Sequence, residues 1–505
     1  MRDLGHILVA AAENAPNAIA IVDGDDRFTY AQWTKQVAGL AGGLARRGAQ
    51  PGDRILCALQ NRWEAAALYW ACQLGGFVFA PVNWRVSASE LDHYLTDSGA
   101  CLLVHEAVSA DAVAGSQAAQ RVRAVSVDEG GAAGPASFAA LLAGEDQIGG
   151  HADPENISIL LYTSGTTGRP KGVPRRHRME HAAAQRQIAI NELVRGDVAL
   201  GCMPLFHTMG IRALVCAAYL QGTFVCMRRF DAQHALDLIA SERVTHLGLV
   251  PTMYHDMVEL PSASAADLSS VDRLMSAGAP LTQALLDRLG AIFTPARIVN
   301  QYGSTEIYVS TFESAAAARP GSVGKPSAPT SIRVVQIEAT DPTQCVRRGE
   351  EGQVIVSLDG EDAFEGYWHL PEADEKAIRD RWYFTGDLGH QNAEGDLFVT
   401  GRVDDLIISG GENISPVEIE NKLMLYPGIA EAVVVGLPDP RLGQAVTAAV
   451  RAVASIDPRE LDQFCRKAGL PGYKCPKRYI FVHEIPRSPS GKILRRKLIS
   501  QLAGL

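Results

Sequence analysis

The stretch that decides the fold is YTSGTTGRPKG, residues 162–172, which follows directly on the apolar run SILL at residues 158–161. It combines hydroxyl side chains, glycines and one lysine, Lys171. Hydroxyls, glycine amides and an ammonium after a buried strand are the groups that surround a polyphosphate, although an ordinary polar loop has a similar composition. Pro170 precedes Lys171 and Gly172 follows it, so the stretch is no P-loop of the G-x-x-x-x-G-K-[ST] type.

Helical and strand-like segments alternate on the N-terminal side of this stretch. Residues 31–47 and 63–72 have helical periodicity, and the short apolar runs RILCAL (54–59) and FVFAPV (77–82) alternate with them. This alternation is typical of β-α-β units on a largely parallel sheet. The uncharged run 65–82 approaches the length of a membrane span, but glycines and a proline interrupt it, so it predicts a buried helix, a turn and a strand.

The C-terminal part of the sequence has a different texture. Gly-punctuated alternating segments from about residue 321 to 400 predict antiparallel, barrel-like strands. From Ser415 the sequence SPVE predicts a capping box and a helix with proline at its first position. The runs 431–436 and 445–453 predict two strands and 457–467 predicts a helix, enough for a small α/β domain of about 100 residues.

The composition excludes several classes of protein. A chain of 505 residues that is 47% hydrophobic is too long for one core, so two or more domains are expected. A net charge of -10 argues against a nucleic-acid binder and gives no long-range attraction for a nucleotide, so any phosphate site must be local. The nine cysteines are scattered and never spaced as C-x-x-C, which predicts neither disulfides nor a zinc site but a reducing cytoplasm. Residues 1–20 predict a first helix and no secretion signal.

Motifs that follow one order along residues 162–496 resemble the adenylate-forming superfamily of acyl-CoA synthetases, luciferases and peptide-synthetase adenylation domains. They are YTSGTTGRPKGV followed by His177, MPLFH ending at His207, SAGAP at 276–280, QYGSTE at 301–306, WYFTGD ending at Asp387, GRVDDLIISGGENISPVEIE at 401–420 and PRSPSGKILRR around Lys492. Three segments, GRVDDLIISGGENISPVEIE, GLPDPRLGQAVTA and YKCPKRYIF, make the chain resemble aryl-CoA ligases of the 4-halobenzoate type in particular.

The resemblance implies an α/β fold in two domains. Residues 1–401 would form a large multi-subdomain N-terminal domain with two α/β sheets and a barrel-like β part. Residues 402–404 would form a hinge, and residues 405–505 a small mobile α/β domain.

The resemblance also implies an enzyme that joins a carboxylic acid to coenzyme A, using ATP and Mg²⁺. The carboxylate would first displace pyrophosphate from ATP to give an acyl adenylate, and the CoA thiol would then displace AMP. Two anions meet in the first step, so the site must neutralise both. Only 13 residues follow Lys492 (505 minus 492), which favours free CoA over a fused carrier protein and leaves a carrier supplied in trans as the alternative.

The ATP site is expected, by resemblance, to draw on several of these motifs. Thr305 would bond the α-phosphate, and Glu306 would hold Mg²⁺, a hard cation that prefers oxygen ligands. Asp387 would accept from both ribose hydroxyls with Arg402 nearby, and Lys492 would bridge the substrate carboxylate and the α-phosphate. The residues expected around the phosphates are Thr163, Ser164, Gly165, Thr166, Thr167, Gly168 and Lys171, and those at the adenine are Gly278, Ala279, Pro280, Tyr302 and Gly303.

Each of these residues has an ordinary alternative when it is taken singly. Glu306 and Lys492 would be solvated surface charges, Asp387 a turn cap and Tyr302 a core residue. Only the motif around each residue favours the functional role.

The acyl site is expected beside His207, which resembles an aromatic gate between the acyl pocket and the CoA channel; a satisfied semi-buried histidine is the alternative. The predicted lining residues are Thr208, Met209, Leu249, Ala277, Tyr308 and Val309. Tyr308 fills space that a long alkyl chain requires, which predicts a compact aromatic or cyclic, benzoate-like carboxylate, with a medium-chain fatty acid as the alternative. None of the six is charged, which disfavours a dicarboxylate.

Coenzyme A is expected, by resemblance, to enter a tunnel lined by Gly410 and Gly411 after the small domain turns about the hinge residue Asp404. The residues expected at its nucleotide are Tyr473 on the adenine, Lys477 on a phosphate, and Arg85. Cys475 departs from the pattern, because halobenzoate-type ligases have an arginine there; Lys474 or Arg478 would substitute.

Three functions therefore compete: a CoA ligase, an adenylation enzyme that loads a carrier protein, and a non-catalytic adenylate-binding module. The module is disfavoured because every charged residue that the chemistry needs is present. The expected partners are a small carboxylic acid, ATP and CoA, with no nucleic acid and no membrane span. The sequence leaves a homodimer open.

Overall fold

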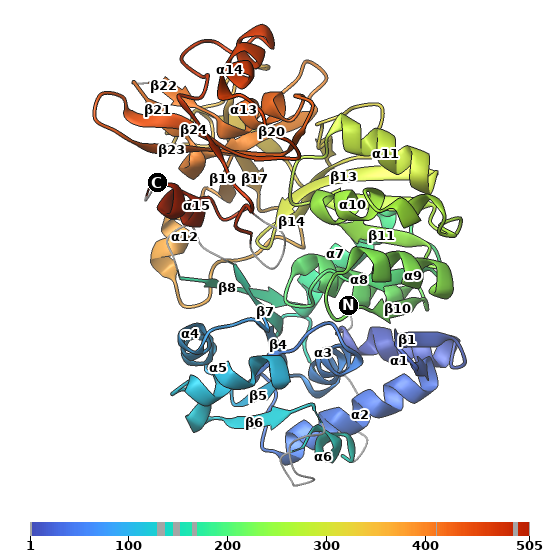
Figure 1. Ribbon diagram of the computed structural model, residues 1–505. Helices are drawn as coiled ribbons and strands as arrows, with labels where there is room; N and C mark the ends of the chain where they lie inside the picture. Colours follow the sequence, from blue (N-terminus) through green and yellow to red (C-terminus); the bar gives the residue numbers. More distant parts are fainter. Residues whose placement is uncertain are drawn as a thin grey trace. The chain divides into compact units, whose positions relative to one another are not determined.

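The computed structural model describes residues 3–128, 137–144, 152–163, 169–410, 412–487 and 493–503 (Figure 1). The chain forms two compact units, Met1–Ser331 with Ser357–Arg381, and Ile332–Val356 with Trp382–Leu505. The predicted α/β class, with several sheets and a small C-terminal α/β part, is confirmed. The predicted hinge at 402–404 concerns a movement between two arrangements and stays a prediction.

The first unit contains a nine-stranded sheet in the order β15-β14-β13-β12-β11-β9-β10-β1-β2. Its central pairs, from β13 through to β1, are parallel, and the outer pairs are antiparallel. The strands are β1 Ile19–Asp23, β2 Asp26–Thr29, β9 Val198–Gly201, β10 Thr223–Cys226, β11 His246–Leu249, β12 Arg273–Ala277, β13 Arg297–Ser304, β14 Tyr308–Glu313 and β15 Lys325–Pro326.

The order of strands in this sheet reverses at β9. The next strand, β10, pairs with one side of β9, whereas β11 pairs with its other side. Open parallel sheets bind ligands outside the carboxyl ends of their strands at such a reversal. We therefore expect a ligand site among the residues that follow β9, β11, β12 and β13.

A six-stranded sheet, in the order β6-β5-β3-β4-β7-β8, lies in the same unit. All its pairs are parallel except the hairpin of β7 and β8. The strands are β3 Arg54–Ala58, β4 Val78–Pro81, β5 Leu102–His105, β6 Arg123–Ser126, β7 Ile157–Thr163 and β8 Lys171–Arg176. The predicted strands at 54–59, 77–82 and 158–162 are confirmed.

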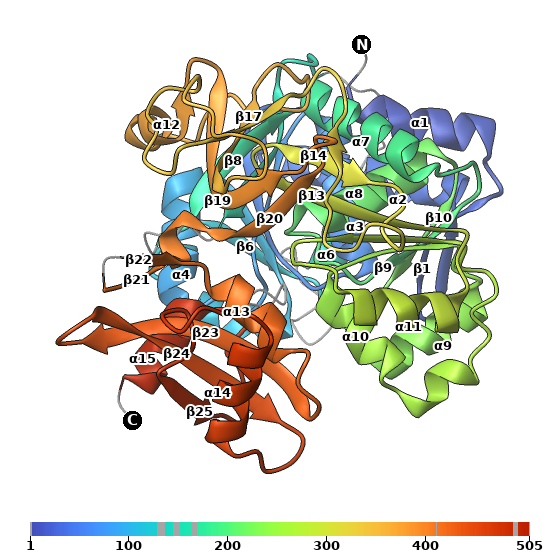
Figure 2. The same ribbon diagram turned by 90° about the horizontal axis from the view of Figure 1, so that it is seen from above.

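Helices cover the sheets of the first unit. Figure 2 shows α9, α10 and α11 on one face of the nine-stranded sheet and α7 and α8 on the other, in agreement with the contacts of α8 and α9 with β9. The helices are α1 Gly5–Asn14, α2 Tyr30–Arg46, α3 Trp63–Gly75, α4 Ala88–Ser98, α5 Ala110–Gly115, α6 Phe138–Leu142, α7 His177–Asn191, α8 Thr208–Tyr219, α9 Ala232–Glu242, α10 Pro251–Val258, α11 Gln283–Phe293 and α12 Pro371–Ala377, and a short strand β18, Ile378–Arg379, follows them. The predicted first helix, and the helices predicted at 31–47 and 63–72, are confirmed as α1, α2 and α3.

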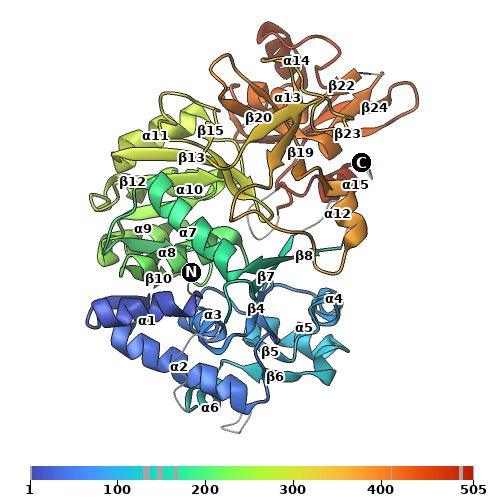
Figure 3. The ribbon, with the colours of Figure 1, turned by 180° about the vertical axis from the view of Figure 1, so that it is seen from behind.

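One hydrophobic core joins the two sheets of the first unit. It contains Trp33 of α2, Trp70 of α3, Phe79 of β4 and Ile211 and Leu214 of α8. Helices α1, α2 and α3 contact one another and can be followed together in Figure 3. The uncharged run 65–82 is thus a buried helix, turn and strand, as predicted. No helix among the residues described is both long and apolar enough to cross a membrane.

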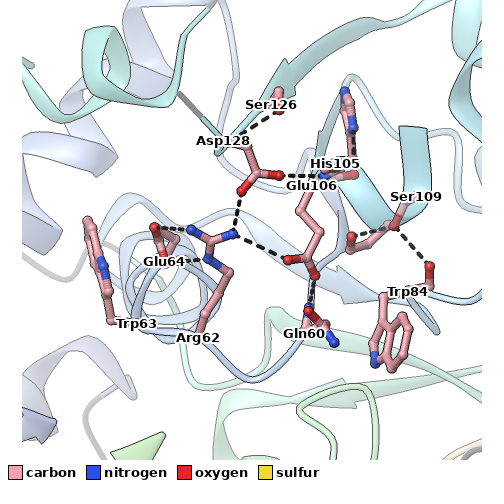
Figure 4. Close-up of polar contacts among 12 residues, drawn as sticks. Gln60, Arg62, Trp63, Glu64, Trp84, His105, Glu106, Ser109, Ser126 and Asp128 are labelled. Carbon is pink, nitrogen blue, oxygen red and sulfur yellow. Dashed lines mark hydrogen bonds and ion pairs between the residues drawn. The ribbon is translucent and has the colours of Figure 1, made fainter. Parts of the chain in front are cut away.

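A buried ion cluster lies at the carboxyl ends of β3 and β5, where the strand order of the six-stranded sheet reverses (Figure 4). Arg62 Nε lies 2.7 Å from Glu64 Oε2, and Arg62 Nη1 lies 2.8 Å from Asp128 Oδ1 and 3.3 Å from Glu106 Oε2. Burial raises the pKa of Glu106, and hydrogen bonds from the Gln60 amide and Arg62 oppose the shift. Arg62 contacts all three carboxylates, so the cluster connects the loop after β3 with the residues that follow β5 and β6.

The second unit consists of two mostly antiparallel sheets and three helices. One sheet contains β16 Ile332–Val335, β17 Gly352–Ser357, β19 Trp382–Gln391 and β20 Leu397–Arg402, as the alternating pattern predicts. The other contains β21 Ile407–Ser409, β22 Glu412–Ile414, β23 Ile429–Asp439, β24 Gly443–Ala452 and β25 Arg478–Phe481. The helices are α13 Pro416–Leu423, α14 Pro458–Lys467 and α15 Arg495–Leu502.

Successive side chains of β23 point to opposite faces of the sheet and belong to two small hydrophobic cores. Val434 packs with residues of α13 and α14, whereas Val433 and Val435 pack with Leu498 and Leu502 of α15. The sheet is therefore covered on both faces, which explains its continuous apolar strands.

The predicted capping box at the start of α13 is wrong, although the helix begins at Pro416 as predicted. Ser415 is the N-cap residue, but its side chain makes no capping bond. Its hydroxyl donates to the Thr400 carbonyl at 2.7 Å, and Glu418 pairs with Lys474 instead of turning back to Ser415. Tertiary partners have replaced the local capping bonds.

Candidate active site

The carboxyl ends of four adjacent parallel strands carry most of the predicted acyl and adenine residues. His207 and Thr208 follow β9, Leu249 ends β11, and Ala277 ends β12. Residues 278–280 follow β12 and are exposed, and Tyr302, Gly303 and Ser304 end β13. The sheet thus assembles, at its strand reversal, residues that are about 100 positions apart in the sequence.

Two glycines at this edge are required by the backbone. Gly278 has φ +86°, a left-handed conformation that side chains other than glycine rarely adopt. A Cβ on Gly303 would lie 1.3 Å from the Tyr308 carbonyl oxygen, so no other residue fits there without movement of the β13–β14 hairpin. These positions keep the edge of the sheet tight where the adenine is expected.

His207 is the N-cap residue of α8, and its carbonyl accepts from the Ile211 amide at 3.2 Å. Its ring lies 5.8 Å, centroid to centroid, from that of Phe206. Met209, in the first turn of α8, packs against the core of β11 and β12, and Leu249 is fully buried in that core. His207 and Thr208 are half-buried, in agreement with a position at the entrance of the site.

Glu306 is held by two hydroxyl groups. Ser304 Oγ donates to Glu306 Oε2 at 2.7 Å, and the Tyr367 hydroxyl donates to Glu306 Oε1 at 2.9 Å. Only 6% of Glu306 is exposed. The two hydroxyl donors fix the direction of the carboxylate.

The β7–β8 hairpin brings Thr163 and Lys171 together as a cross-strand pair. The predicted phosphate residues Ser164, Gly165, Thr166, Thr167 and Gly168 lie outside the described residues, between these two strands. Lys171 Nζ lies 4.6 Å from the centroid of the Tyr367 ring, a cation–π distance. The predicted phosphate lysine and the predicted metal carboxylate therefore share one neighbour, Tyr367.

Sequence reasoning missed Tyr367. Its segment runs beside β8, because the Trp368 amide donates to the Gly172 carbonyl at 2.8 Å, and the Phe364 amide donates to the Glu306 carbonyl at 2.9 Å. The available signal was the sequence GYW at 366–368, in which Gly366 has φ +140° and turns the aromatic residues toward β8.

A single anchored carboxylate fits magnesium. Among the residues described, no group of three or more histidine, cysteine or acidic side chains converges as a metal site. Mg²⁺ commonly binds through one or two carboxylates together with substrate phosphates and water, so Glu306 meets this requirement without a preformed cage.

Tyr308 is placed in a buried polar cluster. Its hydroxyl donates to Glu180 Oε1, its exposure is 5%, and burial raises the pKa of its phenol, so it is a proton donor at neutral pH. The next residue, Val309, is half-buried, and its carbonyl accepts from Arg186 Nη1 at 3.2 Å.

In the second unit, two predicted ribose residues meet across neighbouring strands. Asp387 of β19 and Arg402 of β20 are a cross-strand pair, and Arg402 Nη1 donates to Asp387 Oδ1 at 2.6 Å. The Thr385 hydroxyl accepts from the Asp387 amide at 3.0 Å. The carboxylate is therefore oriented by a guanidinium and by its own turn.

The hinge and tunnel residues follow in sequence. Asp404 is exposed in a short 3₁₀ turn, Val403–Asp405, directly after β20. Gly410 has φ +61° and donates its amide to the Leu442 carbonyl at 2.8 Å. Gly411 and Lys492 lie outside the described residues.

Of the residues expected at the CoA nucleotide in the second unit, some are exposed and others have partners within the protein. Tyr473 is 47% exposed, but Lys477 Nζ donates to the Gly472 carbonyl at 2.9 Å. Cys475 is fully buried, and Lys474 Nζ lies 2.6 Å from Glu418 Oε2.

In the first unit, the Arg85 guanidinium lies 4.2 Å from the centroid of the neighbouring Trp84 ring. Arg85 is exposed. Its contact with the CoA nucleotide, like those of Tyr473 and Lys477, stays a prediction.

Comparison with known proteins identifies the family of the chain. Residues 8–368 match the family described as AMP-binding enzyme, and residues 418–492 match the AMP-binding enzyme C-terminal domain. A feruloyl-CoA synthase from Amycolatopsis sp is 36% identical over 97% of this chain and 97% of that protein. A fatty acid–[acyl-carrier-protein] ligase from Streptomyces coeruleorubidus is 33% identical over 98% of this chain and 95% of that protein.

The fold is shared with a solved structure of a ligase. The o-succinylbenzoate coenzyme A synthetase from Bacillus subtilis, in complex with ATP and magnesium ion, superposes with a TM-score of 0.84 at 28% identity, over 97% of this chain and 98% of that chain. With both family regions matched in order along the chain, the protein belongs to the AMP-binding enzymes of the adenylate-forming superfamily.

Proposed function

We propose that this enzyme is an ATP-dependent carboxylate:CoA ligase that acts through an acyl adenylate, on a compact aromatic or cyclic carboxylate. The observation that carries the proposal is the Lys171–Tyr367–Glu306 arrangement, in which Lys171 begins β8 and Glu306 follows β13. Lys171 supplies a positive charge and Glu306 an oriented carboxylate, the two groups that binding of a metal-bound polyphosphate requires.

In the first half-reaction, an oxygen of the substrate carboxylate attacks the α-phosphorus of ATP, and the bond to the bridging oxygen of the leaving pyrophosphate breaks. Lys171 and Thr163 bind the outer phosphates. Glu306 would hold Mg²⁺, and the ion would supply positive charge to the phosphates. Thr305 hydrogen-bonds the α-phosphate. Lys492 adds a positive charge between the two reacting anions, where negative charge accumulates in the transition state.

In the second half-reaction, the CoA thiolate attacks the acyl carbonyl, and the bond to AMP breaks, so that AMP leaves with its phosphate charge. The proposal assigns Asp404 as the pivot of residues 405–505 and Gly410–Gly411 as the lining of the pantetheine tunnel. A pivot of this kind would let Lys492 serve the first step and the glycine loop the second.

The aromatic substrate class is supported by the fixed ring of Tyr308 and by similarity to enzymes named for feruloyl and o-succinylbenzoyl substrates. The similarity to a fatty acid–[acyl-carrier-protein] ligase supports the second candidate, a fatty acid passed to a carrier protein.

A panel of acids tests the substrate class. Pyrophosphate release should be fastest with benzoate and its ring-substituted relatives. If decanoate exceeded them by about tenfold in kcat/KM, a difference of about 1.4 kcal/mol in transition-state binding, the compact-acid proposal would be wrong.

The acceptor is tested separately, by AMP release with the preferred acid in the presence and absence of free CoA. Multiple turnovers with free CoA support the ligase. A single turnover that only a carrier protein relieves supports the second candidate.

A further inference from the structure

Tyr308 has a backbone conformation that an aromatic residue rarely adopts. Its φ is +47°, in the left-handed region, at the start of β14, where Ser304 of β13 is its cross-strand partner. Residues in this region persist where the surroundings fix them, and such positions gather at functional sites. The surroundings of Tyr308 therefore have to explain its conformation.

Two arginines and a glutamate enclose the Tyr308 ring. The guanidinium carbon of Arg175 lies 3.7 Å from the ring centroid, and that of Arg212 lies 4.2 Å from it. The Tyr308 hydroxyl donates to Glu180 Oε1, which also lies 3.1 Å from Arg175 Nε. Arg175 and Glu180 are fully buried, and Arg212 is 7% exposed.

The cluster resists displacement of the ring. Arg175 Nη1 donates to the Glu306 carbonyl at 3.3 Å, and its Nη2 donates to the Asp362 carbonyl, so this arginine cannot follow a moving ring. A cation–π contact is strongest where the cation has lost its water, as here. Moving the ring would remove one partner from buried charges that have no water to replace it.

The position of the cluster relates it to the acyl site. Arg212 follows Thr208, a predicted lining residue of the acyl pocket, by four residues on α8, so its Cα lies about one helical turn, or about 6 Å, further along the helix and on the same face. The Arg212 guanidinium lies on the Tyr308 ring, so the cluster is connected to the helix that carries Thr208.

We propose that Arg175, Glu180 and Arg212 lock the Tyr308 ring as the end wall of the acyl pocket and thereby set the length of acid that the enzyme accepts. The inference rests on the proposed ligase function. It assigns Arg212 and Glu180 as specificity-determining residues, which act by holding Tyr308 in place and not by touching the reacting atoms.

Two variants test the wall. Tyr308→Gly removes the ring and suits the positive φ, so the backbone is relieved and the wall is opened. Arg212→Leu removes one guanidinium and leaves Arg175 and Glu180 as a neutral pair, which keeps the remaining charges compensated. The measurement is kcat/KM for benzoate, hexanoate, octanoate and decanoate by pyrophosphate release, together with the KM for ATP.

The decanoate-to-benzoate ratio of kcat/KM should rise at least about tenfold in Tyr308→Gly. It should rise about threefold to tenfold in Arg212→Leu, because loss of one cation–π contact loosens the ring without removing it. The KM for ATP should change little in Arg212→Leu. A general structural defect would lower all acids together and would not change the ratio.

Arg273→Leu is the matched control. Arg273 is a buried arginine, paired with Asp197 at 2.6 Å, at the amino end of β12, the end remote from the site. The Arg273→Leu variant should be less stable than the wild type, with an unchanged decanoate-to-benzoate ratio of kcat/KM. The lock is refuted if Tyr308→Gly and Arg212→Leu keep the wild-type ratio while they still activate benzoate. If the wild type released pyrophosphate with no carboxylate of the panel, the proposed function itself would fail.

Discussion

The hydroxyl of Tyr367 donates a hydrogen bond of 2.9 Å to Glu306 Oε1, and the Tyr367 ring lies 4.6 Å from Lys171 Nζ. The hydroxyl of Tyr367 thus contacts the carboxylate proposed for Mg²⁺, and its ring contacts the ammonium proposed for the phosphates. The two groups are therefore linked through one neutral aromatic residue.

Tyr367→Phe removes the hydroxyl and keeps the ring. The variant should need a higher concentration of Mg·ATP, with KM for ATP raised about tenfold or more, as expected for loss of a hydrogen bond to a charged group. The KM for the acid should be unchanged. Tyr367→Leu, which also removes the cation–π contact, should be worse, and equal rises in both KM values in Tyr367→Phe would contradict the assigned role.

Asp387→Asn tests the ribose assignment. The amide accepts at one atom only and leaves Arg402 without its charged partner at 2.6 Å. The KM for ATP should rise about tenfold or more, with little change in the KM for the acid. Titration with ATP and with 2′-deoxy-ATP gives the decisive comparison: the wild type should discriminate between the two nucleotides, and the variant should do so much less.

Asp404→Pro tests the hinge. Proline fixes φ near about -65°, so it should block a rotation at this residue. Adenylate formation should stay nearly intact and thioester formation should be impaired, which single-turnover kinetics with supplied acyl adenylate and CoA can separate. Equal loss in both half-reactions would point to misfolding or to a pivot elsewhere.

Arg62→Met tests the ion cluster of Figure 4. Removal of Arg62 leaves the buried carboxylates of Glu64 and Glu106 without their cation, which should lower the free energy of unfolding by roughly 3–5 kcal/mol. Arg27→Ala is the control, because Arg27 is half-exposed and pairs with Glu242; the substitution should cost less than about 1 kcal/mol. Urea unfolding measures both, and equal losses would refute the structural importance of the cluster.

His177 gives the protein a sensitivity to acid. Its Nδ1 accepts from the Leu4 amide at 3.2 Å, and burial lowers its pKa to about 4, although Asp3 and Glu180 oppose the shift. The unfolded chain therefore takes up a proton below about pH 6.5 before the folded protein does. The stability contributed by the neutral ring is complete above that pH and is lost as the pH falls toward 4, by an amount on the order of 3 kcal/mol.

His177→Asn retains an acceptor for the Leu4 amide but has no proton to gain. The difference in urea midpoint between pH 7.5 and pH 5 should be smaller in this variant than in the wild type. Some dependence should remain, because burial also lowers the pKa of His246 to about 4. An unchanged pH dependence would show that His177 is not a source of it.

The local elements could be predicted from the sequence, whereas the supports of the site could not. The helix at Tyr30–Arg46, the strand at Ile157–Thr163 and the start of α13 follow from periodicity, apolar runs and proline placement. Arg175 and its acceptor Asp362 are 187 positions apart, and no local pattern links such residues. The same limit explains why the role of Tyr367 was missed and why Ser415 was assigned a capping bond.

Pyrophosphate exchange is the measurement that tests the account most directly. The enzyme is incubated with Mg·ATP, labelled pyrophosphate and benzoate without CoA, and label in ATP is counted. The account predicts exchange that depends on the acid and not on CoA, with AMP and an acyl-CoA thioester formed in equal amounts once CoA is added. Release of ADP and phosphate, or exchange that requires CoA, would contradict an acyl adenylate intermediate.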